Sequence, residues 1–366
     1  MKFTVDRESL LKPLQQVIGV VERRQTLPVL GNLLIIAGKD GLQITATDLE
    51  VEIQATAKIG VDEAGEITLP ARKLIDICKA LPEGASIQVT IKDQKAQIRS
   101  GKSRFTLSTL PATDFPVVDQ VQGESNFSIE QGKLKELIDR TQFSMAQQDV
   151  RYYLNGLMLE IGKGLLRAVA TDGHRLALCD MNVDLASDHT RQVIVPRKGI
   201  QELQRLLEDS KETVNVEVGT NHVRVRTPEV SFTSKLVDGR FPDYDRVVPK
   251  GGDKIVVADR DLFRQALSRT SILSNEKYRG IRLNLEKNNV KIQAHNPEQE
   301  EADEEFEVDY DGLPLEIGFN VTYLLEVLGS VRSENVEITL SDSNSSCLIR
   351  QPGTQQYRYV VMPMRL

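Results

Sequence analysis

The chain has 366 residues, of which 40% are hydrophobic and 27% are charged, and its formal net charge is −7. This is the composition of an ordinary folded protein, and the length favours two or three domains over one core. The acidic total argues against a protein that simply coats nucleic acid, although a single basic face is compatible with it.

Localisation and cofactor signals point to a cytoplasmic protein without a metal. There is no apolar run of about 18 residues that would span a membrane, and the start, MKFTVDRESL, lacks the apolar stretch of a signal peptide. Cys78, Cys179 and Cys347 lie in apolar surroundings without CxxC or zinc-type spacing. We therefore expect buried free thiols, a reducing compartment, no membrane association and no cofactor.

The main organisation is a threefold repeat with a period of about 125 residues. Each repeat contains a strand that runs into an amphipathic helix, a second strand and helix, and a closing β-rich stretch. The starts of these segments, in chain order, are Phe3, Leu69 and Ser103, then Phe127, Val195 and Val230, then Ile255, Ile317 and Tyr357. The repeat predicts three domains, at residues 1–125, 126–253 and 254–366, with polar linkers at 117–126 and 247–254.

Within each repeat the periodicities predict two helices and several antiparallel strands. Residues 33–57 alternate around a KDG turn, and residues 86–110 are typical of a hairpin. Apolar residues recur at helical spacing, as in the stripe Leu262, Ala266 and Leu267. Two helices that cover one side of an antiparallel sheet make an α+β layer, so we expect three repeated α+β domains.

The most enzyme-like string is ATDGHRLAL at residues 170–178, where Asp172 and His174 resemble an acid/base pair. The first repeat has ATDLEVEI at the same place, which favours a turn of the scaffold, and Asp-Gly after a strand is a common hairpin turn. Four histidines without metal-ligand spacing and the absence of phosphate-binding glycine motifs further weigh against catalysis.

Basic and aromatic residues suggest contacts with nucleic acid. Arg72 and Lys198 fall at the starts of the second helices of repeats one and two, where cations oppose the helix dipole, and Arg205 follows. Tyr152 and Tyr153 follow a polar stretch and suit contacts with sugar–phosphate or unpaired bases. The alternatives are a solvated polar face for the cations and half-buried tyrosines before a strand.

Opposite charges at the two ends of the chain suggest head-to-tail association into a ring. The acidic excess is concentrated in PEQEEADEEFEVDYD at residues 297–311, which would ordinarily be a solvated segment. It complements a basic and apolar edge in the first repeat, and an apolar pair follows a helix of the third. The residues that we expect at this interface are Lys102, Arg104, Phe105, Leu107, Ile272, Leu273, Glu298, Glu300, Glu301 and Glu304.

The sequence resembles the bacterial DNA sliding clamp, the β subunit of DNA polymerase III, over its whole length. The strings that carry the resemblance include TLPVLGNLL, PARKLIDIC, QFSMAQQDVRYYLNG, FTSKLVDGRFPDY, SNEKYRGIRL and VVMPMRL. The resemblance implies a homodimeric ring of six similar domains with helices lining the hole. Duplex DNA would thread through the ring without sequence preference, and the ring would tether DNA polymerases and repair proteins without catalysing a reaction. A clamp-loader complex would be a further partner.

The resemblance also implies two sets of binding residues. DNA contacts would fall on Arg24, Arg72, Gln148, Tyr152 and Tyr153, with Lys198 and Arg205 as additions on the inner face. A pocket for short apolar partner motifs would straddle repeats two and three. Its residues would be Leu154, Thr171, Gly173, His174, Arg175, Leu176, Pro242, Arg246, Val247, Asn320, Tyr323, Ser346, Val360, Met362, Pro363, Met364, Arg365 and Leu366. One departure from the family is Asn344, where some members carry an apolar residue, and it bears on motif preference.

Two other functions stay open on the residues alone. A hydrolase built on Asp172 and His174 predicts loss of turnover when His174 is replaced by Ala. A monomeric DNA-binding adaptor predicts no effect of replacing Ile272 and Leu273 by Ala, whereas a ring would shift toward monomers.

Overall fold

The computed structural model describes residues 1–21, 27–118, 123–185 and 189–365. The chain divides into two compact units, Met1–Gly132 with Lys198–Leu236, and Lys133–Arg197 with Val237–Leu366. Each unit therefore combines one outer repeat with part of the middle repeat.

In the described part of the first unit, antiparallel strands form two sheets, in the orders β5-β1-β7-β8-β9 and β10-β15-β16-β17-β4-β3-β2-β6. The strands are β1 Lys2–Asp6, β2 Asn32–Gly38, β3 Gly41–Thr47, β4 Val51–Ala57, β5 Val61–Glu63, β6 Gly65–Pro70, β7 Ser86–Lys92, β8 Lys95–Ser100, β9 Ser103–Ser108, β10 Gly123–Glu130, β15 Thr213–Gly219, β16 His222–Arg226 and β17 Val230–Lys235.

The described part of the second unit likewise has two antiparallel sheets, in the orders β14-β11-β12-β13-β25-β24-β23-β18 and β21-β20-β19-β22. The strands are β11 Gly156–Gly162, β12 Leu165–Thr171, β13 Arg175–Asn182, β14 Arg191–Pro196, β18 Lys254–Asp259, β19 Gly280–Glu286, β20 Asn289–His295, β21 Glu301–Glu307, β22 Leu315–Asn320, β23 Asn335–Leu340, β24 Cys347–Arg350 and β25 Tyr357–Val361.

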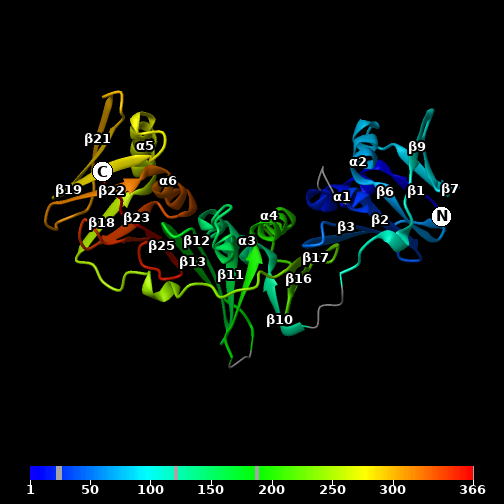
Figure 1. The fold of residues 1–366 in the computed structure, drawn as a ribbon, viewed down its shortest axis with the longest axis horizontal. Coiled ribbons are helices and arrows are strands. Elements are labelled where there is room, and N and C mark those ends of the chain that lie inside the picture. The colour runs from blue at the N-terminus through cyan, green and yellow to red at the C-terminus, as the bar shows by residue number, and fades with distance from the viewer. Residues whose placement is uncertain (22–26, 119–122, 186–188, 366) are drawn as a thin grey trace. The chain divides into compact units, whose positions relative to one another are not determined.

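Two helices per repeat appear where the sequence predicts them. They are α1 Arg7–Val17, α2 Ala71–Ala80, α3 Gln131–Asp139, α4 Arg197–Leu206, α5 Arg260–Thr270 and α6 Val321–Ser330. An aspartate caps the start of the first helix in both the first and the third repeat. Asp6 accepts from the backbone N–H of Ser9, and Asp259 accepts from the backbone N–H of Leu262, both at 2.8 Å. Within their own units, α1 lies beside α2 and α5 beside α6 (Figure 1).

The sheets run through the junctions between repeats. Strand β17 of the second repeat pairs with β4 of the first, from Val230 opposite Ala55 to Ser234 opposite Val51. Strand β13 of the second repeat pairs with β25 of the third, from Arg175 opposite Val361 to Cys179 opposite Tyr357. Consecutive repeats are therefore joined by a continuous hydrogen-bonded ladder as well as by their linkers.

The α+β class and the two-helix repeat are confirmed, while some local predictions change. Residues 86–110 contain the three strands β7, β8 and β9 where a two-stranded hairpin was predicted. In the predicted α5 stripe Ala266 and Leu267 are buried as expected, whereas Leu262 is 53% exposed and its neighbour Phe263, 3% exposed, takes the inward position. Strand β10 begins at Gly123, inside the predicted linker. The domain boundaries themselves stay predictions.

The three cysteines are free and fully buried, as the sequence predicts. Burial raises the pKa of the Cys78 thiol to about 11 and that of Cys347 to about 12. These thiols therefore act as small apolar core residues.

Candidate functional sites

The DGHR turn, residues 172–175, connects β12 to β13 and is held by its own side chains. The Oδ1 atom of Asp172 accepts from the backbone N–H groups of His174 at 2.9 Å and Arg175 at 3.0 Å. Gly173 has φ +90°, which favours glycine. The His174 ring stacks on Tyr323, with ring centroids 6.4 Å apart. Asp172 thus serves as the turn residue that the repeat comparison favoured.

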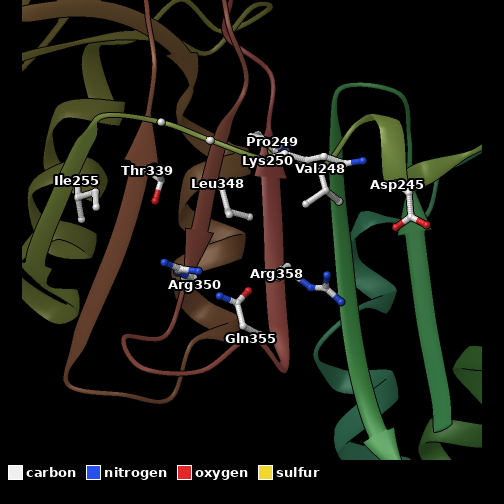
Figure 2. Close-up of a pocket in the computed structure, with 12 residues that line it drawn as sticks. Asp245, Val248, Pro249, Lys250, Ile255, Thr339, Leu348, Arg350, Gln355 and Arg358 are labelled. Atoms are coloured by element: carbon white, nitrogen blue, oxygen red, sulfur yellow. The ribbon is translucent and has the colours of Figure 1, made fainter.

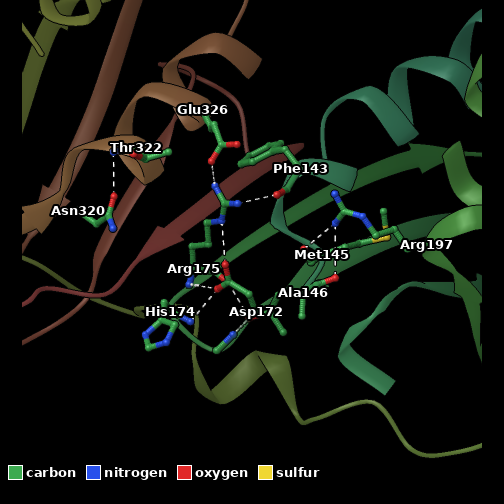
Figure 3. Close-up of polar contacts among 12 residues, drawn as sticks. Phe143, Met145, Ala146, Asp172, His174, Arg175, Arg197, Asn320, Thr322 and Glu326 are labelled. Carbon is green, nitrogen blue, oxygen red and sulfur yellow. Dashed lines mark hydrogen bonds and ion pairs between the residues drawn. The ribbon is translucent and has the colours of Figure 1, made fainter. Parts of the chain in front are cut away.

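Arg175 is a buried link between the turn and the third repeat, 9% exposed (Figure 3). Its Nε donates to Asp172 Oδ2 at 3.1 Å, its Nη2 donates to the Phe143 carbonyl at 2.7 Å, and its Nη1 pairs with Glu326. The guanidinium lies 4.6 Å from the Tyr323 ring centroid and 5.4 Å from that of Phe143. Because two carboxylates already neutralise it, this cation fixes the DGHR turn to Phe143 and Glu326 and is not a free charge. Sequence reasoning missed its partners Phe143 and Glu326.

An apolar cluster in the second unit brings together several predicted pocket residues. Leu154, Leu176 and Val360 are at most 1% exposed and belong to one buried cluster, against which Val247 packs. Leu176 and Val360 are direct partners in the β13–β25 ladder. The cluster therefore supplies an apolar floor next to the DGHR turn.

The C-terminal segment borders this floor. The backbone N–H of Met362 donates to the His174 carbonyl and that of Met364 donates to the Gly318 carbonyl, each at 2.9 Å. The Met362 residue is 41% exposed. The segment is thus fixed to both the turn and β22 while it presents an apolar side chain outward. Leu366 lies outside the described residues.

The other predicted pocket residues lie around these elements. Thr171 closes the turn by donating to the Arg175 carbonyl at 2.6 Å, and Asn320 caps α6 by accepting from the Thr322 N–H at 2.9 Å. Pro242 lies between β17 and β18, as does Arg246, whose exposed side chain pairs with Asp243 at 2.8 Å. Ser346 and Pro363 adjoin β24 and the end of β25.

A cavity of about 400 Å³ adjoins the C-terminal segment and contains residues that sequence reasoning did not select. Met364 and Arg365 line it together with Asn275, Tyr278 and His295 among others. Tyr278 is 57% exposed. The sequence signal for this cavity was a tyrosine, Tyr278, in a polar loop, and this tyrosine does not differ in pattern from others in the sequence.

Among the predicted DNA contacts, a loop of the second unit carries Gln148, Tyr152 and Tyr153. Gln148 is exposed at φ +56°, and Tyr152 is 57% exposed with its ring 5.8 Å from that of Tyr153. Asp149 holds the loop because it accepts from Arg151 at 2.8 Å. Arg24 lies outside the described residues.

Three predicted cationic contacts lie in the described part of the first unit, and each has a partner inside that unit. Arg72 Nη2 donates to the Val21 carbonyl at 2.9 Å, and Lys198 Nζ lies 2.5 Å from Asp48 Oδ2. Arg205 donates to the Gln15 carbonyl at 2.9 Å and to the Gln16 carbonyl at 2.6 Å. These three cations therefore have structural contacts regardless of any DNA.

The predicted association edges are both outer strands of their sheets. Within the described residues β9 pairs only with β8, and β21 pairs only with β20. Lys102 and Arg104 are exposed at β9, where Phe105 is half-buried and Leu107 is buried. Glu298, Glu300 and Glu301 are exposed at or before β21, whereas Glu304 accepts from Arg269 at 2.5 and 3.0 Å. Ile272 is 75% exposed and Leu273 is half-buried.

Within the described ranges, no helix has the length and apolar character needed to cross a membrane. The same residues contain no group of three or more His, Cys, Asp or Glu side chains placed to hold a metal ion.

Comparisons with known proteins cover the whole chain. The N-terminal, central and C-terminal domains of the DNA polymerase III beta subunit match residues 1–119, 128–243 and 245–365. The beta sliding clamps of Pseudomonas putida KT2440 and Escherichia coli K12 are 60% and 54% identical to it, with 100% of each chain covered. A crystal structure of the Pseudomonas aeruginosa sliding clamp bound to griselimycin has a TM-score of 0.98 at 59% identity, again over 100% of both chains.

Proposed function

This chain belongs to the family of DNA polymerase III beta subunits, the sliding clamps, and we propose the surfaces through which it assembles, holds DNA and recruits partners. The protein is a non-catalytic processivity factor, a ring-forming clamp on duplex DNA that tethers polymerases. As a bacterial replication clamp it acts in the cytoplasm, and we propose that the DNA it encircles places it at the nucleoid.

We propose that the ring closes between β9 of one copy and β21 of another. The observation that carries this proposal is that both are outer strands with opposite charge, Lys102 and Arg104 at one and Glu298, Glu300 and Glu301 at the other. Outer strands offer unpaired backbone N–H and C=O groups to another chain, and complementary charge selects the partner edge. Exposed Ile272 and its neighbour Leu273 would supply apolar contact beside these strands.

We propose that the inner DNA surface includes Arg24, Arg72, Gln148, Tyr152 and Tyr153. Exposed polar and aromatic side chains in the 148–153 loop suit sequence-independent contacts with sugar and phosphate. Among the described residues, Arg72, Lys198 and Arg205 already bond within the protein, which suits sliding because extensive phosphate neutralisation would hold the ring at one place. The sequence also predicts Lys198 and Arg205 as DNA contacts. Each already has an ion-pair partner, Asp48 or Glu202, so we leave both out of the proposed DNA surface.

We propose that partners dock over the buried cluster of Leu154, Leu176 and Val360, on the surface that half-buried Val247 and exposed Met362 present beside the DGHR turn. An apolar floor with a flexible methionine at its margin suits short peptides with apolar anchors from polymerases, repair proteins and the clamp loader. Griselimycin, bound by the Pseudomonas aeruginosa relative, is our proposed ligand for the same surface.

The test compares retention on closed circular DNA with retention on the same DNA after linearisation, following loading by a clamp-loader complex. A ring remains on the closed circle and slides off free ends, so we expect linearisation to release it. Equal retention on both forms would point to a monomeric DNA-binding adaptor and contradict the ring. His174→Ala should weaken griselimycin binding and leave retention on circles unchanged.

A further inference from the structure

The connector between β17 and β18, residues 237–253, carries three of the predicted pocket residues, Pro242, Arg246 and Val247. Its only regular structure among described residues is a single 3-10 turn, Tyr244–Arg246. A segment with so little regular structure needs side-chain anchors to hold a defined position.

Tyr244 provides such an anchor, because its side chain is buried at 5% exposure and bonds to the neighbouring sheet. Its hydroxyl donates to Glu160 Oε2 at 3.0 Å and accepts from Arg167 Nη1 at 3.1 Å. Its carbonyl accepts from the backbone N–H groups of Val247 at 3.0 Å and Val248 at 3.2 Å. The side chain of Tyr244 thus bonds to the sheet, and its backbone bonds to the connector turn.

The partners of Tyr244 are themselves fixed across neighbouring strands. Glu160 of β11 lies opposite Arg167 of β12, and Arg167 lies opposite Asp180 of β13. Arg167 donates to both oxygens of Asp180, at 2.6 and 2.9 Å, and Asp180 also accepts from Arg358 of β25 at 2.9 Å. This row of charged residues reaches from the second repeat into the third, so the hydroxyl meets a rigid bonding site.

Beyond Tyr244 the connector borders a cavity of about 450 Å³. Val248, Pro249 and Lys250 lie along one side of it, near the strands that carry Leu348 and Arg358 (Figure 2). Val248 packs against the apolar cluster on one side and faces this open space on the other, so packing alone holds the stretch less firmly and the bonds at Tyr244 contribute more to its position.

We propose that Tyr244 is a positioning residue for partner binding, which holds the connector turn so that Val247 packs against the apolar floor. This inference rests on the proposed partner site. Without the hydroxyl bonds the turn would sample other positions, and binding would have to select the competent one, so affinity falls by the fraction of molecules in that position.

The test is the affinity of griselimycin, measured by calorimetry on the full-length protein. Tyr244→Phe removes only the hydroxyl, and we expect about tenfold weaker binding, the size expected when hydrogen bonds to charged groups are lost. Glu160→Gln keeps an acceptor for the hydroxyl and should stay within about twofold of the parent. The matched control is Tyr310→Phe, since Tyr310 is 1% exposed and its hydroxyl donates to the Leu313 carbonyl at 2.5 Å, so this variant also removes a buried tyrosine hydroxyl but leaves the bonds of Tyr244 in place.

The outcomes separate the two proposals. If the parent protein binds griselimycin and Tyr244→Phe binds equally well, the positioning role is wrong while the partner site stands. If the parent does not bind it, the proposed partner site fails. Equal weakening by Tyr310→Phe would attribute the loss to general destabilisation and overturn the role of Tyr244. Amide exchange of Val247 and Val248 should accelerate in Tyr244→Phe alone.

Discussion

Arg205 provides a sharp test between a structural and a DNA-binding role. The helix α1 has no basic residue in its own last turn. The last carbonyls of a helix lack partners within it and are stabilised by donors from elsewhere. Arg205 donates to two of these carbonyls, those of Gln15 and Gln16, while Glu202 accepts from its Nη2 at 2.7 Å. We therefore expect Arg205→Ala to loosen the end of α1 without removing a DNA contact.

The magnitude follows from the two lost hydrogen bonds. Bonds from a charged donor are worth about 1.5–3 kcal/mol each when buried, but the Arg205 side chain is 40% exposed, which reduces their value. We expect Arg205→Ala to lower the free energy of unfolding of the first unit by about 1–2 kcal/mol. For a unit of this size the melting temperature should fall by about 2–8 °C.

The deciding assay is the salt dependence of DNA binding together with thermal unfolding. Loss of one phosphate contact reduces the slope of log K against log salt by about 0.9, whereas a structural residue leaves the slope unchanged. We expect a lower melting temperature and an unchanged slope for Arg205→Ala. A slope lower by about 0.9 with an unchanged melting temperature would refute this reasoning and restore Arg205 to the DNA surface.

Three further predictions concern the other surfaces. Ile272→Asp places a carboxylate in the proposed interface and should shift the protein toward monomers in sedimentation velocity. The control Leu262→Asp changes another exposed apolar position and should leave the dimer intact. Arg175→Met should lower the free energy of unfolding of the second unit by about 3 kcal/mol, because it leaves the largely buried Asp172 carboxylate and the Phe143 carbonyl without this donor. A loss below about 1 kcal/mol in urea titration would contradict the link. Hydrogen bonds from Arg151 lower the pKa of Asp149 from 3.8 to about 2. The contact between Asp149 and Arg151 is therefore fully present above about pH 4 and is lost as the pH falls through about 2. A carboxyl NMR titration of Asp149 with its midpoint near 3.8 would disprove this contact.

The periodicity of apolar residues was enough to predict the repeated helices and strands. It did not predict which side chains of a helix face the core or which strands pair across repeats. A helix stripe is read from spacing alone, and in α5 the stripe Phe263, Ala266 and Leu267 differs from the predicted one by a single position. Such a shift is expected where adjacent residues are both large and apolar, because only the tertiary contact decides which one turns inward. The pairing of β17 with β4 depends on residues far apart in sequence, and no local pattern encodes it.

The candidate sites show the same division. The role of Asp172 as a turn residue was predictable, because its hydrogen bonds lie within three residues. The burial of Arg175 was not, since its partners Phe143 and Glu326 come from distant segments. A cation in a sequence is ambiguous between a ligand contact and an internal ion pair until its neighbours in space are known.

Repetition creates a pairing problem that the charged contacts at the junctions help to solve. Three similar repeats present similar strand edges, so β4 and β25 would compete for similar partners if backbone bonding alone decided. The junctions instead carry different side-chain contacts, with Lys198 paired to Asp48 at one and Arg358 paired to Asp180 at the other. Mispaired edges would leave these charges without partners, which costs free energy wherever they are partly buried. The ion pairs that differ between the two junctions therefore help to specify which strand edges pair, and this explains why several basic residues that resemble a DNA surface in the sequence have internal partners in the structure.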